Sequence, residues 1–332
     1  MKNLIPFLVF IAFVLQGCHF STSEVTRGYQ IDNATRTEIN SLDIKVYQDM
    51  QLGDFEAFNT LIAPSLKKEL SYDGNRQTWS NLGQILQHKS YRMYDEINIT
   101  SLIPGYNLKV NSLDSTDNSV ITLTTTCRET EISFLMLEDS VSQFLMAAIY
   151  GKYNGKWLLS GFSIGCYSYF GKTAPAYYSL ARKYYERGDL VDAVVNIAMC
   201  SRCLHPCKTI VTYKKATAIN RFTDKLINDT KAKYGFPFTL NNIKSKPVIS
   251  GIEPERLGAE LVPEIDYMSG TNIKDTTRLR KENEEVQKSV GELFQGVKDN
   301  NAHILYRVSC LLPTEEHRTH TYNFVETTGK GH

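Results

Sequence analysis

The residues most able to do chemistry form a run of cysteines in the second half of the chain. It reads Cys200-Ser-Arg-Cys203-Leu-His205-Pro-Cys207. Thiolates and imidazole are ligands that zinc prefers, and the weak candidates for a metal site are therefore Cys200, Cys203, His205 and Cys207. Pro206 interrupts a helix at this point, and no second Cys-x-x-Cys pair exists in the chain. We therefore predict no metal or other cofactor. We expect either disulfides or buried thiols at a helix contact.

Cys127 and Cys166 form a separate candidate disulfide pair. Both stand in segments of alternating apolar residues, Cys127 on the side of Ile121 and Leu123, and Cys166 on the side of Ile164. We expect both thiols to face the apolar side of a sheet. A disulfide between them and two buried thiols are both compatible with this pattern.

The remaining acid–base groups match no catalytic motif. Between residues 36 and 170, the carboxylates that could act as general acid or base in a pocket are Asp95, Glu96, Glu129 and Glu131. The only histidine in this segment is His88. His317 and His320 form a His-x-x-His pair without the glutamate of zinc proteases, and we expect them in an exposed loop after Pro313. No nucleophile motif and no phosphate-binding glycine loop is present. We therefore predict no catalytic residue.

The amino end has the features of an export signal. Lys2 precedes an apolar run from Leu4 to Leu15 that only Pro6 interrupts. As a helix this run would be about 18 Å long, whereas the hydrocarbon core of a bilayer is about 30 Å thick. The run is therefore too short to span a membrane, and it is typical of the apolar centre of a signal peptide.

Leu15-Gln16-Gly17-Cys18 resembles the lipobox of bacterial lipoproteins, although Gln16 stands where small or apolar residues are commoner. The resemblance implies that residues 1–17 are removed and that acyl chains on Cys18 anchor the protein to a membrane. His19 is not the aspartate that retains enterobacterial lipoproteins in the inner membrane. This implies an outer-membrane location in the cell envelope, facing the periplasm. The alternative is an ordinary secretory signal followed by an incidental cysteine.

Composition and length limit the classes of protein. The chain has 332 residues, with 37 basic and 36 acidic side chains and no basic run. It therefore offers no electrostatic basis for nucleic-acid binding. A chain of this length exceeds one typical core, and its ordinary apolar content predicts a folded α+β protein of several domains.

The first half of the chain places helices before strands. Residues 18–35 are polar and predict a lipidated tether, and a helical pattern follows to about residue 90. The strand-prone segments after it are 92–102, 118–128, 130–138 and a hairpin around Asn154-Gly155. This order, with Gly155-Lys156-Trp157 opening the last strand, resembles the NTF2-like superfamily over residues 36–170. The resemblance implies a curled antiparallel sheet, a cone with a pocket, and a possible homodimer.

Residues 173–235 form a predicted helical unit. Tyr177, Ala181, Gly188 and Ala193 fall close to the pattern of a single tetratricopeptide (TPR) hairpin, which the segment resembles. A long helix over about 209–233 is expected to complete it.

Residues 243–332 predict a small α+β domain that resembles no family we recognise. The expected elements are strands at 247–252 and 260–268, a helix at 275–299, and strands at 303–312 and 321–326.

Together these features predict a membrane-anchored envelope lipoprotein that acts as a non-enzymatic binding or scaffolding module. Its expected partners are the membrane and another envelope protein. The alternative is a small-ligand carrier or an enzyme that uses the pocket of the NTF2-like cone.

Overall fold

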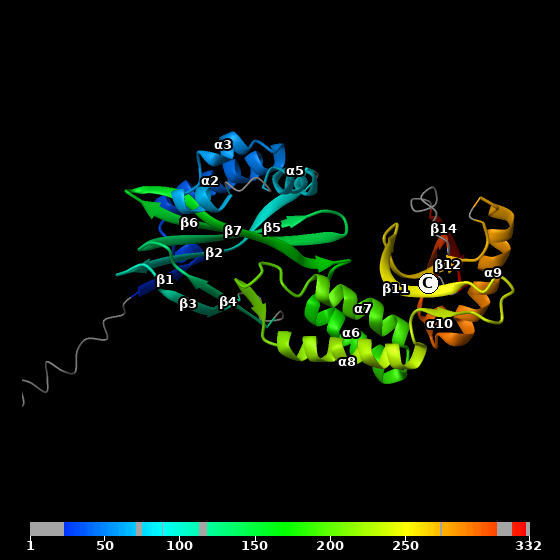
Figure 1. Ribbon diagram of the computed structural model, residues 1–332. Helices are drawn as coiled ribbons and strands as arrows, with labels where there is room; N and C mark the ends of the chain where they lie inside the picture. The colour runs from blue at the N-terminus through cyan, green and yellow to red at the C-terminus, as the bar shows by residue number, and fades with distance from the viewer. Residues whose placement is uncertain are drawn as a thin grey trace, which may run out of the picture.

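The computed structural model describes residues 23–70, 75–87, 89–112, 118–272, 274–310 and 321–329. It is a mixed α+β protein, which confirms the predicted class. Three parts follow one another along an elongated molecule (Figure 1). We call them the N-terminal part (residues 23–173), the helical part (174–234) and the C-terminal part (238–329). In the described residues, no helix is long and apolar enough to cross a membrane.

The N-terminal part is built on a curled antiparallel sheet of order β1-β2-β5-β6-β7-β8. Its strands are β1 (Ser23–Arg27), β2 (Ser90–Ser101), β5 (Glu129–Glu138), β6 (Ser142–Tyr153), β7 (Lys156–Tyr169) and β8 (Lys172–Thr173). The predicted hairpin joins β6 to β7, and Asn154 and Gly155 take the left-handed conformation that such a turn requires. Register shifts interrupt the β2–β5 and β6–β7 ladders, and irregularities of this kind bend and twist a sheet.

Four helices cover one face of this sheet (Figure 1). They are α2 (Asn33–Leu52), α3 (Phe55–Asn59), α4 (Pro64–Leu70) and α5 (Asn75–Leu86). The Asp32 carboxylate caps α2 by accepting from the Thr35 amide at 2.9 Å, and Asp54 caps α3 as its sequence position predicts. Phe58, Trp79 and Trp157 fill the space between the helices and the sheet.

The opposite face of the sheet packs against a smaller antiparallel sheet. This consists of β3 (Asn107–Asn111), β4 (Ser119–Thr124) and β9 (Val211–Tyr213). The prediction of one continuous strand over 118–128 is wrong, because β4 ends at Thr124 and a turn leads into β5. The helix expected from residue 209 begins only at Ala216, because Val211-Thr212-Tyr213 pairs with β4 instead.

The prediction of a tether over residues 18–35 is wrong for the described residues 23–35. Ser23–Arg27 forms β1, which pairs with β2, and α2 begins at Asn33. β1 has no clear alternation of apolar residues, so its sequence gave no strand signal. It is held by the free edge of β2 and by an ion pair between Arg27 and Asp95. Such long-range pairing overrides local propensity.

The helical part contains α6 (Ala174–Arg187), α7 (Leu190–Arg202) and α8 (Ala216–Tyr234). Gly188 has a φ of 84° and ends α6, so that α7 can turn back along it. Ala181 and Ala193 are fully buried in this part. The sequence predicted this hairpin from those small residues.

The C-terminal part is a mixed sheet of order β10-β11-β12-β13-β14. Its elements are β10 (Phe238–Thr239), β11 (Val248–Leu257), β12 (Glu260–Ser269), α9 (Thr276–Leu293), α10 (Val297–Asn300), β13 (His303–Cys310) and β14 (Tyr322–Thr327). β12 and β13 are parallel, and α9 makes the crossover that parallel strands need. The helix expected to reach residue 299 stops at Leu293, because Phe294 takes an extended conformation, and α10 starts only after Gly296.

Gly165 on β7 allows the loop after α7 to lie directly against the six-stranded sheet of the N-terminal part, which we call the main sheet. A Cβ added to Gly165 would be 2.6 Å from the Pro206 carbonyl oxygen and 2.8 Å from that of His205. We expect Gly165→Ala to lower the free energy of unfolding by about 1–3 kcal/mol, because backbone atoms would have to shift. Thermal unfolding followed by circular dichroism measures this change.

Gly161→Ala on the same strand is the matched control. Its added Cβ would meet only the Ile149 side chain, at 3.6 Å, so its effect should stay below about 1 kcal/mol. Equal effects of the two substitutions would show that the close approach at Gly165 is not a constraint on folding.

Candidate functional site

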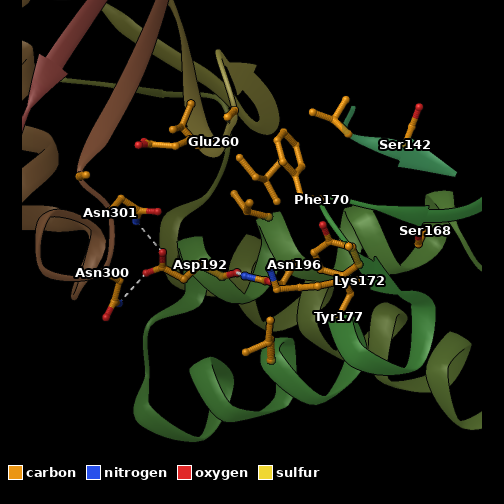
Figure 2. A pocket seen from close by; sticks show the side chains of 18 of the residues that line it. Ser142, Ser168, Phe170, Lys172, Tyr177, Asp192, Asn196, Glu260, Asn300 and Asn301 are labelled. Atoms are coloured by element: carbon orange, nitrogen blue, oxygen red, sulfur yellow. Dashed lines mark hydrogen bonds between the residues drawn. The ribbon is translucent and has the colours of Figure 1, made fainter. Parts of the chain in front are cut away.

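A cleft of about 810 Å³ lies where the three parts of the protein meet (Figure 2). The N-terminal part contributes the β5–β6 turn and the β7–β8 turn, the helical part contributes one side of α6 and α7, and the C-terminal part contributes the β11–β12 turn and the segment after α10. Because no single part encloses this space, the cleft depends on how the three parts are held together. We refer to it below as the cleft.

Asp192 forms the wall between the helical part and the C-terminal part. Its carboxylate accepts from Asn300 Nδ2 at 2.9 Å and from Asn301 Nδ2 at 2.7 Å, as Figure 2 shows. Asn196, one helical turn later, donates to the Asp192 carbonyl oxygen at 2.8 Å. Burial raises the pKa of Asp192 to about 6, against the lowering effect of the two asparagine donors.

Residues of the turn before α7 form an ion pair and further hydrogen bonds at the contact between the helical part and the C-terminal part. Arg187 Nη2 lies 2.7 Å from Asp189 Oδ2 and 2.9 Å from Asn300 Oδ1. Gln295 Nε2 donates to the Arg187 carbonyl oxygen at 2.9 Å. A Cβ at Gly296 would lie 2.5 Å from Asp189 Oδ1, so the two turns touch closely. We call this network, together with Asp192 and Asn301, the polar joint.

The side of the cleft that the main sheet contributes is also lined by polar groups. The Asp139 carboxylate accepts from the Ser142 hydroxyl at 2.7 Å and pairs with Lys89. Burial opposes its ionisation, but hydrogen bonds from Lys89 and the following backbone amides hold the pKa of Asp139 below its usual range. Ser168 Oγ donates to Gln143 Oε1 at 2.7 Å.

An aromatic ring and a cation come from the β7–β8 turn. Phe170 and Gly171 have φ values of 46° and 69°, the left-handed pair of a tight hairpin turn. In Figure 2 the Phe170 ring lies between the hairpin that carries Glu260 and the strand that carries Ser142. Lys172 follows on β8 and is exposed. The cleft therefore offers an apolar surface beside polar groups, which include both negatively and positively charged side chains.

The described lining contains no histidine and no cysteine. Of its three serines, Ser142 donates to the Asp139 carboxylate and Ser168 donates to the Gln143 amide oxygen. Asp139 is paired with Lys89 and its pKa lies below the usual range, so it is a poor general base for a hydroxyl nucleophile. Amide side chains, a cation and apolar rings instead suit noncovalent recognition.

The carboxylates predicted to face a pocket lie in the N-terminal part. Asp95 pairs with Arg27, Glu96 lies 2.6 Å from Arg36 Nη2, and Glu129 lies 2.8 Å from Lys152 Nζ. Glu131 is fully buried.

A further buried acid, Asp43 on α2, was missed. It accepts from the Tyr150 hydroxyl at 2.7 Å, and burial raises its pKa to about 6. Burial raises the pKa of Glu131 to about 8, and the nearby carboxylates of Glu96 and Asp43 add to this.

The cysteines predicted as one cluster point to different places. α7 ends at Arg202, so no helix continues through Cys207. Cys200 is buried between helices, Cys207 donates to the Leu145 carbonyl oxygen at 3.4 Å, and His205 is exposed. In the described residues no group of three or more histidine, cysteine or acidic side chains is placed to hold a metal ion.

Cys166 contacts Cys203 and not Cys127. The two sulfur atoms of Cys166 and Cys203 are 2.9 Å apart, and the thiols of Cys127, Cys166, Cys200, Cys203 and Cys207 are free. Cys127 lies against Gly151 and Cys166 lies opposite Phe144, seven residues away along β6. That separation is about 23 Å of strand, too far for the disulfide that the sequence suggested.

Some predicted residues lie outside the described residues: Cys18, His88, His317 and His320. The residues that form the cleft wall, Asp192, Asn300 and Asn301, were not predicted from the sequence. Asp192 carried one signal, because a carboxylate stands in the apolar run Leu190-Val-Asp-Ala-Val-Val195. Such a position indicates a buried acid with dedicated partners.

Comparisons of the chain with protein families, with curated proteins and with solved structures found no match.

The buried Glu131 predicts a dependence of stability on pH. Its pKa rises from 4.5 to about 8 on folding, so its contribution is fully present below pH 4.5 and is lost as the pH rises toward 8. Glu131→Gln, which carries no charge, should match the wild type near pH 4 and exceed it increasingly up to about pH 8. The gain is at most on the order of 5 kcal/mol, at about 1.4 kcal/mol per pKa unit.

Urea unfolding at a series of pH values measures this difference. Glu129→Gln is the control, because Glu129 lies on β5 like Glu131 but is half-exposed and paired with Lys152 of β6, and it should show no such gain. A constant difference between Glu131→Gln and wild type at all pH values would contradict the buried, protonated carboxyl.

The contact between Cys166 and Cys203 predicts a specific oxidation product. The hydrogen bond from Cys203 holds the pKa of Cys166 below its usual range, which favours the reactive thiolate. Diamide should take two electrons and two protons from the pair, leaving a Cys166–Cys203 disulfide. Burial raises the pKa of Cys200 to about 12, so that thiol should stay reduced.

Mass spectrometry of digested protein, with remaining thiols blocked under denaturing conditions, detects the linked peptides. Cys203→Ser should abolish the product. Recovery of a Cys127–Cys166 peptide instead would show that the contact seen here does not govern oxidation.

Proposed function

We propose that this protein is a membrane-anchored lipoprotein of the cell envelope that binds a segment of another protein in the cleft, without catalysing a reaction. The observation that carries the proposal is the cleft itself. All three parts of the protein contribute side chains to it. A binding site at a junction of domains is a common arrangement.

The family resemblances belong to this proposal. Helices that precede a curled antiparallel sheet support an NTF2-like N-terminal part, and the antiparallel α6–α7 pair supports a TPR-like hairpin. A single such hairpin cannot bury its faces alone. Here α8 and the N-terminal part cover it, because its core includes Tyr213, Leu226 and Phe144. We infer that the hairpin is a framework that positions the cleft walls.

The chemistry of the cleft favours a peptide over a small apolar molecule. Gln143 and Asn196 present side-chain amides, which can pair with the donors and acceptors of a peptide backbone. Phe170 and Leu261 supply apolar contacts for side chains. Lys172 adds a positive charge that suits an acidic residue of the bound segment.

The alternative of a ligand carrier that uses the cone has less support. Met50, Phe58 and Trp157 are buried between the helices and the main sheet, where the ligand of such a cone would lie. Apolar side chains packed at the density of a protein interior leave little space for a ligand.

The anchor is tested by Cys18→Ser. Removing the thiol removes the site of acylation, so the protein should move from the membrane fraction to the soluble fraction of cells. The measurement is an immunoblot of the separated fractions. Unchanged membrane fractionation would contradict the anchor and leave binding in the cleft untouched.

Binding in the cleft is tested by photo-crosslinking in cells. A photoreactive amino acid at Leu261, which lines the cleft, should capture a partner protein. The same amino acid at Lys231, which is exposed on α8, should not. Phe170→Ala should reduce the yield at Leu261 severalfold, because the ring contact is lost. The same products from both positions would rule out the cleft as the binding site.

A further inference from the structure

Two large apolar side chains stand in solvent at one end of the N-terminal part. Leu102 and Ile103 follow the last residue of β2 and are 62% and 69% exposed. Pro104 and Gly105 continue this turn, and both are exposed as well. Adjacent exposed apolar residues on a turn differ from single scattered ones, because they form a contiguous apolar tip.

The apolar tip lies beside the start of β1. Ser23 pairs with Ser101 in the ladder between β1 and β2, so Leu102 is next to the residue at which the described chain begins. Ser23 is only five residues after Cys18 in the sequence. Five residues span at most about 18 Å when fully extended. An anchor at Cys18 therefore keeps this end of the sheet close to the bilayer surface.

Two exposed basic side chains lie at the same end of the sheet as the tip, together with the acids Glu24 and Glu129, which both pair with Thr100 in the ladders. The Ser101 amide donates to the Arg128 carbonyl oxygen at 2.8 Å, which places the exposed Arg128 in the neighbouring turn. The β6–β7 hairpin ends on the same side of the sheet, because Thr130 of β5 pairs with Gly151. It carries the exposed Lys156 at the start of β7. Basic residues beside an apolar tip are the composition of segments that lie in the interface of a bilayer.

We propose that the turn containing Leu102 and Ile103 is a membrane-contact site, with both side chains in the lipid interface and Arg128 and Lys156 near lipid phosphates. This inference rests on the lipid anchor of the proposed function. The short length of chain between Cys18 and β1 favours a lipid surface as the occupant over a second copy or another protein. Two separate contacts with one membrane fix an orientation that acyl chains alone leave free.

This orientation also determines how far the cleft lies from the lipid surface. α2 begins near β1 and, at 20 residues, extends about 30 Å away from this end. The helical part and the C-terminal part lie beyond the opposite end of the sheet (Figure 1). With Leu102 and Ile103 at the membrane, the cleft is held away from the lipid surface, where a soluble segment can reach it.

Tryptophan fluorescence in reconstituted vesicles tests the contact. The lipidated full chain is placed in vesicles of phosphatidylethanolamine and phosphatidylglycerol whose acyl chains are brominated. Leu102→Trp and Ile103→Trp each add one fluorophore at the tip. Leu52→Trp is the matched control, because Leu52 is 79% exposed at the far end of α2. Trp79 and Trp157 are buried and give the same background in every variant.

Bromine quenches fluorophores within the bilayer, so the added emission at 102 and 103 should fall at least twofold more than that at 52. Equal quenching at all three positions would overturn the contact site. Flotation of the vesicles separates this result from failure of the anchor. Protein that floats without quenching disproves only the contact. Protein that does not float disproves the anchor and, with it, the orientation. Thermal unfolding within a degree or two of wild type confirms that each variant is folded.

Discussion

The cleft depends on the polar joint between the start of α7 and the segment around α10. Asp192 is buried, and both of its oxygens accept from asparagines of the C-terminal part. A buried carboxylate without such donors would cost several kcal/mol, so the helical part and the C-terminal part satisfy each other's polar groups only in this arrangement. Val191, beside Asp192, is buried in the core of the C-terminal part. The joint thus combines an apolar contact, which supplies stability, with directional hydrogen bonds, which select one orientation.

The N-terminal part is attached to the helical part by a different kind of contact. Gly165 permits a backbone-to-backbone approach, and the Tyr177 hydroxyl donates to the Tyr169 carbonyl oxygen at 2.8 Å. Cys207 and Ile210, which follow α7, are buried in the core that lies between the two sheets of the N-terminal part. The chain therefore returns from the helices into the N-terminal part before it enters α8. This return fixes one wall of the cleft relative to another.

Much of the secondary structure could be predicted from the sequence, because periodicity and turn residues are local signals. The Asn154-Gly155 hairpin, the Asp54 cap and the α6–α7 turn at Gly188 all follow from residues near one another in the chain. Features that depend on distant partners could not be predicted. β1 forms because β2 has a free edge, and β9 forms because β4 is there to pair with Val211–Tyr213.

The candidate site was unpredictable for the same reason. Asp192 and Asn300 are more than a hundred residues apart, and no spacing rule connects them. Of the two alternatives for Cys127 and Cys166, the structure shows two buried thiols, because a disulfide would need the two cysteines to lie side by side. Since β4 lies in the smaller sheet, the turn that carries Cys127 is directed to the other end of β6.

The position of β1 also determines how the fold bears mechanical load. A pull on the chain at Ser23, directed along β1, stretches all the backbone hydrogen bonds between β1 and β2 at once, since the strands are loaded in shear. The ion pair of Arg27 with Asp95 stands at the last residue of β1 and resists the same displacement. Tension applied at Ser23 is therefore spread over a whole ladder and ends in an ion pair, before it can reach α2 or the core beneath it.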